Sequence, residues 1–70
     1  MKVFVFEILM ADDSVVRRYG QFKNRADAFE WGITITEEYE NSSKLSVYEL
    51  RGNGNLLDPY LIGHYYAILG

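Results

Sequence analysis

The 70-residue chain contains no cysteine, one histidine and one proline. Without cysteine it has no disulfide, no thiolate metal site and no thiol nucleophile. No apolar run approaches the roughly 18 residues that a membrane-spanning helix needs. No charged leader or apolar targeting segment precedes the first predicted strand, which begins at Lys2. These absences favour a cytoplasmic protein over a disulfide-stapled secreted scaffold.

Motifs that carry chemistry are also missing. The chain has no P-loop, dinucleotide fingerprint or calcium-loop pattern, and its one glycine-rich spot, Gly52–Gly54, lacks the helix and lysine of a phosphate cradle. His64 could act as an acid or base only with a partner, and no spacing favours Asp58 or Glu49. We therefore expect His64 to be a sheet residue with a satisfied ring. The sequence predicts no catalytic residue, no cofactor and no metal.

The charge balance is mildly acidic, with ten acidic and seven basic residues and a net charge of −3. This disfavours a general nucleic-acid binder, which normally carries a basic footprint, and suits a protein partner with a basic surface. The whole chain, residues 1–70, is predicted to form one domain. A domain this small buries only about 60% of its unfolded surface, so association with a partner would add useful stability.

The first predicted strand, Lys2–Met10, is apolar on both of its faces, with Glu7 the only polar interruption inside it. Alternation along the strand separates two sets. They are Phe4, Phe6, Ile8 and Met10 on one side, and Val3, Val5 and Leu9 on the other. A half-exposed strand should alternate apolar with polar residues, so this strand predicts cover on both sides. The rest of the chain offers one helix, which leaves the second side for another copy or a partner protein.

A hairpin is predicted to join this strand to a second one, Val15–Phe22, through the polar segment Ala11–Ser14. If Asp12 and Asp13 are the two loop residues, Glu7 lies opposite Arg18, and Phe6 lies opposite Tyr19.

A helix is predicted to follow, with Asn24 as its N-cap. At about 100° per residue, one side of this helix is apolar. Its members are Ala28, Phe29, Gly32, Ile33, Ile35, Thr36 and Tyr39, with Trp31 at the margin. The alternative is a strand over Trp31–Thr36, which is rich in β-branched residues. The N-cap and the apolar side both favour the helix. In that helix Gly32 would allow close approach to a sheet. Asn41–Ser43 is expected to end it.

Two further strands complete the predicted fold. Lys44–Arg51 forms the third, Gly52–Asn55 a loop, and the fourth lies within Tyr60–Leu69, most securely His64–Leu69. The fold class is therefore α+β: a single small β-β-α-β-β domain, with a four-stranded antiparallel-rich sheet and one helix on one face. Because the first strand is apolar on both sides we place it centrally, in the strand order 2-1-3-4.

Two groups of residues are candidates for partner binding. The first is acidic and consists of Glu30, Glu37, Glu38 and Glu40. Three of these crowd the C-terminal turn of the helix, where the helix dipole disfavours anions. The alternative is that solvent screens them and Lys44 partly compensates. The second group is Tyr19, Tyr48 and Tyr66, since tyrosine is enriched at interfaces; core packing is the alternative role.

These features predict a non-enzymatic protein-interaction module. It would be an inhibitor or adaptor that binds a basic protein surface, or a protein that self-associates as a dimer through the sheet face without a helix. One alternative is an acidic nucleic-acid mimic that blocks a nucleic-acid-binding protein. Another is single-stranded nucleic-acid binding through an aromatic sheet face beside Arg17 and Arg18, which the acidic balance disfavours.

Overall fold

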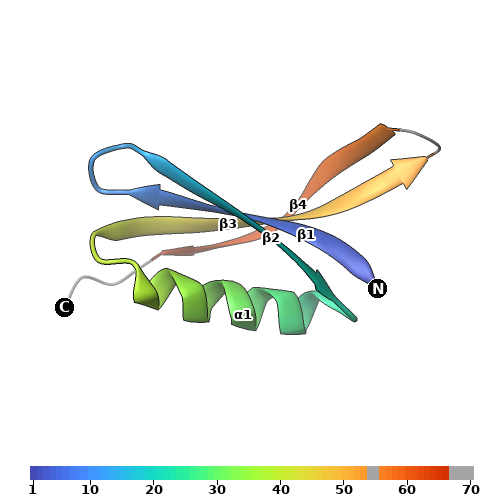
Figure 1. The fold of residues 1–70 in the computed structure, drawn as a ribbon, viewed down its shortest axis with the longest axis horizontal. Coiled ribbons are helices and arrows are strands. Elements are labelled where there is room, and N and C mark those ends of the chain that lie inside the picture. The colour runs from blue at the N-terminus through green and yellow to red at the C-terminus, as the bar shows by residue number, and fades with distance from the viewer. Residues whose placement is uncertain (54–55, 67–70) are drawn as a thin grey trace.

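The computed structural model describes residues 1–53 and 56–66 of the chain. Its elements follow one another in the order β-β-α-β-β. They are β1 (Lys2–Met10), β2 (Val15–Phe22), α1 (Arg25–Glu38), β3 (Ser42–Asn53) and β4 (Leu56–Tyr66). The four strands form one antiparallel sheet in the order β2-β1-β3-β4, and α1 runs along one face of it (Figure 1). The predicted α+β fold and strand order are confirmed.

The helix begins where the sequence predicts. The side chain of Asn24 accepts a hydrogen bond of 2.8 Å from the backbone N–H of Asp27, which satisfies one of the free donors of the first turn. The alternative strand over Trp31–Thr36 is therefore wrong. The helix ends earlier than expected: Tyr39 is the C-cap, and Asn41 adopts a positive φ of 65° before β3 starts at Ser42.

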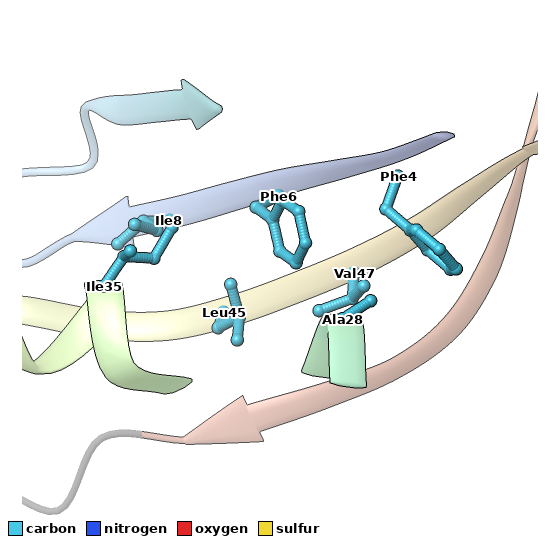
Figure 2. Packing of buried hydrophobic residues seen from close by; sticks show 7 residues of the cluster. All are labelled: Phe4, Phe6, Ile8, Ala28, Ile35, Leu45 and Val47. Carbon is cyan, nitrogen blue, oxygen red and sulfur yellow. The ribbon is translucent and has the colours of Figure 1, made fainter. Parts of the chain in front are cut away.

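The core lies between α1 and the two central strands. Phe4, Phe6 and Ile8 of β1 point toward the helix and are fully buried, and Leu45 and Val47 of β3 are buried beside them. Figure 2 shows these side chains converging on two residues of α1, Ala28 and Ile35. Gly32 permits the close approach, since a Cβ atom there would lie 2.9 Å from Cδ1 of Phe6.

The predicted register of the first hairpin is wrong by one residue. Glu7 lies opposite Arg17, and Val5 opposite Tyr19. The cause is the turn, in which Asp13 adopts a positive φ of 70° and the backbone N–H of Met10 donates to the carbonyl of Ser14 at 2.8 Å. This is a three-residue loop, not a two-residue one. Because side chains alternate along a strand, the shift moves all of β2 to the other face, and Tyr19 lies on the side away from α1.

The second hairpin also differs from the prediction. β3 starts two residues earlier than expected, and Gly52 and Asn53 belong to it, while Gly54 and Asn55 of the expected loop lie outside the described residues. β4 starts before Tyr60 and includes Pro59 opposite Leu50. Proline is tolerated because β4 is an edge strand. On its outer side no neighbouring strand accepts a hydrogen bond, so a missing backbone N–H on that side costs the sheet no hydrogen bond. The expected end of this strand, residues 67–69, lies outside the described residues.

Among the described residues, no helix combines the length and the apolar character that a membrane span requires.

Candidate functional site

One face of the sheet carries no helix, and we call it the open face. It consists of the side chains that alternate with the core residues along each strand. They are Val3, Val5, Glu7 and Leu9 of β1; Val15, Arg17, Tyr19 and Gln21 of β2; Lys44, Ser46, Tyr48 and Leu50 of β3; and Pro59, Leu61, His64 and Tyr66 of β4. No element of the described part of the chain covers this face (Figure 1).

The open face is hollowed toward the end of the sheet that carries the chain's N-terminus. The hollow has a volume of about 450 Å³. Its lining is Val5, Glu7, Arg17, Tyr19, Tyr48, Leu50 and Pro59. Val5 is only 7% exposed at its floor, although no helix lies over it, because Tyr19 and Tyr48 flank it on the neighbouring strands. Tyr19 and Tyr48 therefore bury part of β1 on the open face, although no second layer covers it.

The other half of the open face, beside the β1–β2 turn, carries projecting side chains. Val15 is 51% exposed and Tyr66 65% exposed, and both lie in the row of residues that crosses the sheet at Leu9 and Lys44. This half also holds a second hollow of about 160 Å³, lined by Glu7, Leu9, Val15, Lys44 and Ser46, so hollows and exposed apolar side chains occur at both ends of the open face.

Two polar pairs cross the open face. The guanidinium of Arg17 donates to a carboxylate oxygen of Glu7 at 2.7 Å, and this bond raises the pKa of Arg17. Ser46 Oγ and His64 Nδ1 lie 2.9 Å apart, so the imidazole has a partner, as predicted for His64. The two candidate acids, Glu49 and Asp58, lie on the other face of the sheet. The contact between Ser46 and His64 joins β3 to β4. Among the described residues, no carboxylate forms a hydrogen bond with the imidazole.

The three tyrosines singled out from the sequence share this face. Tyr19 and Tyr48 flank Val5, and Tyr66 lies opposite Lys44. The remaining strand tyrosines point to the helix side, where Tyr65 packs against the core and Tyr60 lies opposite Glu49.

The four predicted acidic residues lie elsewhere. Glu30, Glu37 and Glu38 are exposed on α1, and Glu40 is exposed just after it. Within the described part of the chain none of them forms an ion pair. Because α1 covers the opposite side of the sheet, the seven predicted site residues form two separate surfaces and do not make one site (Figure 1).

The structure adds two acids to the second surface. The β1–β2 turn meets the end of the helix, where the N–H of Ala11 donates to the carbonyl of Asn41 at 2.7 Å, and a hollow of about 210 Å³ lies between Asp12 and Glu40. A bond from the Ser14 hydroxyl lowers the pKa of Asp12. We call this region the acidic end; its members are Asp12, Asp13, Glu37, Glu38 and Glu40. Sequence analysis missed Asp12 and Asp13 because it treated them only as turn residues.

Four basic residues gather at the opposite end of the molecule, which we call the basic end. They are Lys2, Lys23, Arg25 and Arg51. The carboxylate of Glu49, with a side chain only 9% exposed, accepts from Nε of Arg25 at 3.0 Å and from Nε of Arg51 at 3.1 Å. These bonds, that of Arg25 first, lower the pKa of Glu49. The guanidinium of Arg51 also stacks 3.9 Å from the ring centre of Tyr60.

Within the described residues no group of three or more His, Asp or Glu side chains is placed to hold a metal ion. The fold and surfaces define a small α+β domain with an uncovered sheet face. No family model, curated protein or solved structure matches this chain.

Proposed function

We propose that the chain is a non-enzymatic protein-interaction module that binds a protein through its open face. The observation that carries this proposal is the combination of a hollow of about 450 Å³ with exposed apolar side chains on an uncovered sheet. Tyr19, Leu61 and Tyr66 are 62%, 44% and 65% exposed there. Such side chains supply large contact area at low entropic cost and are typical of interface centres.

The charges of the open face favour a protein over a nucleic acid. Arg17 is already paired with Glu7, and Lys44 is the only other Lys or Arg among its side chains. A surface that stacks single-stranded bases normally carries unpaired cations along a groove, so that binding weakens steeply with salt. Salt-sensitive binding of an oligonucleotide by this face would contradict the proposal.

The proposal is tested by affinity capture from the native host with two matched variants. Tyr19→Ser combined with Leu61→Ser removes two exposed side chains from the open face, while Tyr60→Ser removes an equally large side chain, 49% exposed, from the other face. We expect the first variant to lose the captured protein and the second to keep it, with both retaining the circular dichroism of the native fold. Equal capture by all three proteins would refute binding through the open face.

The acidic end favours a second candidate function, docking to a basic protein surface as an inhibitor, adaptor or nucleic-acid mimic. Its support is that the β1–β2 turn, which carries Asp12 and Asp13, meets the chain just after α1, where Glu40 follows the last helical turn with Glu37 and Glu38. Crowded like charges are costly unless a partner neutralises them. The test is Glu37→Lys combined with Glu38→Lys, which should abolish capture of a basic protein, whereas Thr34→Lys on the same exposed side of α1 should not. Unchanged affinity of the double variant would exclude this candidate.

A further inference from the structure

We infer that the outer edge of β2 pairs with the same edge of a second copy of this chain, which joins the two four-stranded sheets into one continuous sheet. The inference goes beyond the proposed function, because it concerns the edge of the sheet and not the open face. The two β2 strands run antiparallel about a two-fold axis perpendicular to the sheet. Each copy presents the same edge to its partner, as a two-fold interface requires.

The outer edge of β2 presents a regular row of backbone donors and acceptors. The N–H of Met10 donates to the carbonyl of Ser14 at 2.8 Å, so these two residues form a hydrogen-bonded pair at the start of the hairpin. Hydrogen-bonded and non-hydrogen-bonded pairs alternate along an antiparallel ladder, and β2 keeps one register with β1 throughout. The N–H and C=O groups of Arg17, Tyr19 and Gln21 therefore point away from β1. Within the described residues no strand pairs with that side of β2.

The other edge of the sheet is blocked against such pairing, whereas the edge of β2 is not. On β4, Pro59 lies opposite Leu50 and has no N–H to donate at the outer edge. The pairing of β4 also shifts its register beside Val47 and Tyr48, and a bulge of this kind bends a strand. Proline and bulges are devices by which sheet proteins prevent edge pairing, and β2 contains neither. The sheet can therefore extend at β2.

Charged side chains can also block an edge, but both arginines of β2 are engaged within their own chain. Arg17 pairs with Glu7 of β1 at 2.7 Å. Arg18 donates to the hydroxyl of Tyr39 at 3.1 Å, and its guanidinium lies over the ring of Trp31, 5.9 Å from the ring centre. Both guanidinium groups are thus turned toward their own chain.

The side chains of β2 are complementary to a second β2 in one register. In a two-fold antiparallel pairing, one residue lies opposite its own counterpart. When that residue is Tyr19, Arg17 of each copy lies opposite Gln21 of the other on the open face. On the side that faces α1, Arg18 lies opposite Gly20, which leaves room for its long side chain. No two like charges lie directly opposite each other in this register.

The neighbouring registers are disfavoured by charge. Pairing centred on Arg18 or on Arg17 would place that arginine opposite its own counterpart. Pairing centred on Gly20 would place Arg17 opposite Lys23. Like charges directly opposite each other destabilise a strand pair, so charge selects the register centred on Tyr19. This self-complementarity is the reason to assign a second copy to the edge.

The size of this edge fits a reversible dimer. The register gives about six backbone hydrogen bonds between the copies, and Val16 lies opposite Phe22 as an apolar pair on the helix side. A pairing of two short strands buries less surface than a standard protein interface, so the dimer should dissociate on dilution.

The first test is amide hydrogen exchange of the native chain at several concentrations, followed residue by residue by NMR. The amides of Arg17, Tyr19 and Gln21 should become protected as the concentration rises, because their N–H groups bond to a strand only in the dimer. The amides of Arg18 and Gly20 face β1 within each copy and should be protected at every concentration. Exchange at the first three positions that does not depend on concentration would overturn the inference.

The second test compares two variants of Gln21 by sedimentation equilibrium. Gln21→Pro removes an N–H that points outward and places a ring where Arg17 of the partner approaches, so the dimer dissociation constant should rise about tenfold or more. Gln21→Ala loses the same side chain but keeps the N–H, and its constant should stay close to the native value. Because this N–H makes no bond to β1, both variants should keep the native circular dichroism. Equal constants for the two variants would refute pairing through the backbone edge.

The third test examines the register and does not depend on how the strand tolerates proline. Gln21→Glu places a carboxylate opposite Arg17 of the partner and should tighten the dimer about threefold, whereas Gln21→Lys should weaken it by a similar factor. Identical dissociation constants for these two variants would refute the register centred on Tyr19.

This inference and the proposed function fail in different ways. A native chain that is monomeric at every concentration overturns the second copy as the occupant of the edge. Capture of a protein by the open face should survive Gln21→Pro, since Gln21 does not line the hollow of about 450 Å³. The proposed function is instead judged by the Tyr19→Ser, Leu61→Ser variant.

Discussion

The two faces of the sheet differ in chemistry as well as in cover. The helix-covered face presents only aliphatic and aromatic side chains at its centre, and Phe4, Phe6, Ile8, Leu45 and Val47 are all fully buried. Phe6 also packs edge-to-face with Trp31, with ring centres 4.8 Å apart. The open face intersperses apolar residues with an ion pair and a hydroxyl–imidazole contact. The helix-covered face is thus buried by folding, whereas the open face keeps polar groups among its apolar side chains and stays in contact with water.

The comparison also explains why β1 is apolar on both sides. On the covered side the helix excludes water from Phe4, Phe6 and Ile8. On the open side Val5 is buried by its neighbours in the sheet, while Val3 and Leu9 remain partly exposed. An apolar residue of a central strand can therefore be buried on a face that no second layer covers, because large side chains on the two neighbouring strands cover it.

The largest expected effect comes from removing a side chain at the centre of the covered face. Phe6→Ala should lower the free energy of unfolding by about 3–5 kcal/mol, since it leaves a cavity against α1 that the core cannot fill. That is most of the stability expected for a domain of this size. Tyr19→Ala on the open face should cost less than about 1 kcal/mol in urea denaturation of the dilute protein. Comparable losses at the two positions would erase the distinction between the faces.

A smaller effect is expected where the helix meets the covered face. In Gly32→Ala the new Cβ would lie 2.9 Å from Cδ1 of Phe6 and 3.0 Å from Cδ2 of Leu45. Alanine gains about 1 kcal/mol of helix propensity, but the overpacking costs about 1–3 kcal/mol, so the variant should be less stable by about 1 kcal/mol. The control is Thr34→Ala on the exposed side of the same helix, which should be neutral or slightly stabilising. A stabilised Gly32→Ala protein would show that the helix–sheet contact is looser than the structure indicates.

A pH-dependent effect is expected at the basic end, where Glu49 joins the sheet to the start of α1. The folded pKa of Glu49 is lowered by Arg25 and Arg51, so its stabilising contribution is present at neutral pH and is lost as the pH falls below the ordinary value of 4.5. Glu49→Gln should therefore lower the thermal midpoint at pH 7 and lower it much less near pH 3. Thermal scans over this range check the prediction, with Glu30→Gln as a control that has no ion pair among the described residues. A constant difference between Glu49→Gln and the native chain at all pH values would contradict it.

The sequence predicts α1 and the central strand β1, but not the register of the first hairpin or the start of β4. Asn24 and the apolar stripe predict α1 because capping and helical periodicity are local properties, and the doubly apolar Lys2–Met10 segment predicts a central strand. The hairpin register could not be read, because Asp12 and Asp13 suit either a two-residue or a three-residue loop, and only the folded backbone shows that Asp13 takes a positive φ. Predicting the position of β4 failed at Pro59, whose tolerance depends on the strand lying at an edge.

The candidate surfaces were only partly predictable for a related reason. Tyr19, Tyr48 and Tyr66 were chosen from composition and do share one face, but the expected register would have turned Tyr19 toward the helix. The basic end draws on β1, the junction of β2 with α1, and β3, which are far apart in the chain, so no local spacing in the sequence predicts it.

The smallest expected effect concerns the turn that sets which residues of β2 join each face. Asp13 has a positive φ of 70°, and glycine adopts that conformation without a steric penalty, so Asp13→Gly should stabilise the fold by about 0.5 kcal/mol. The neighbouring Asp12→Gly should instead destabilise it, because the carboxylate of Asp12 accepts bonds from both the N–H and the hydroxyl of Ser14. Urea denaturation of the two variants measures the difference. If Asp13→Gly were destabilising, the turn conformation would not fix the register, and the packing of Val16, Arg18 and Phe22 on the helix side would have to select it instead.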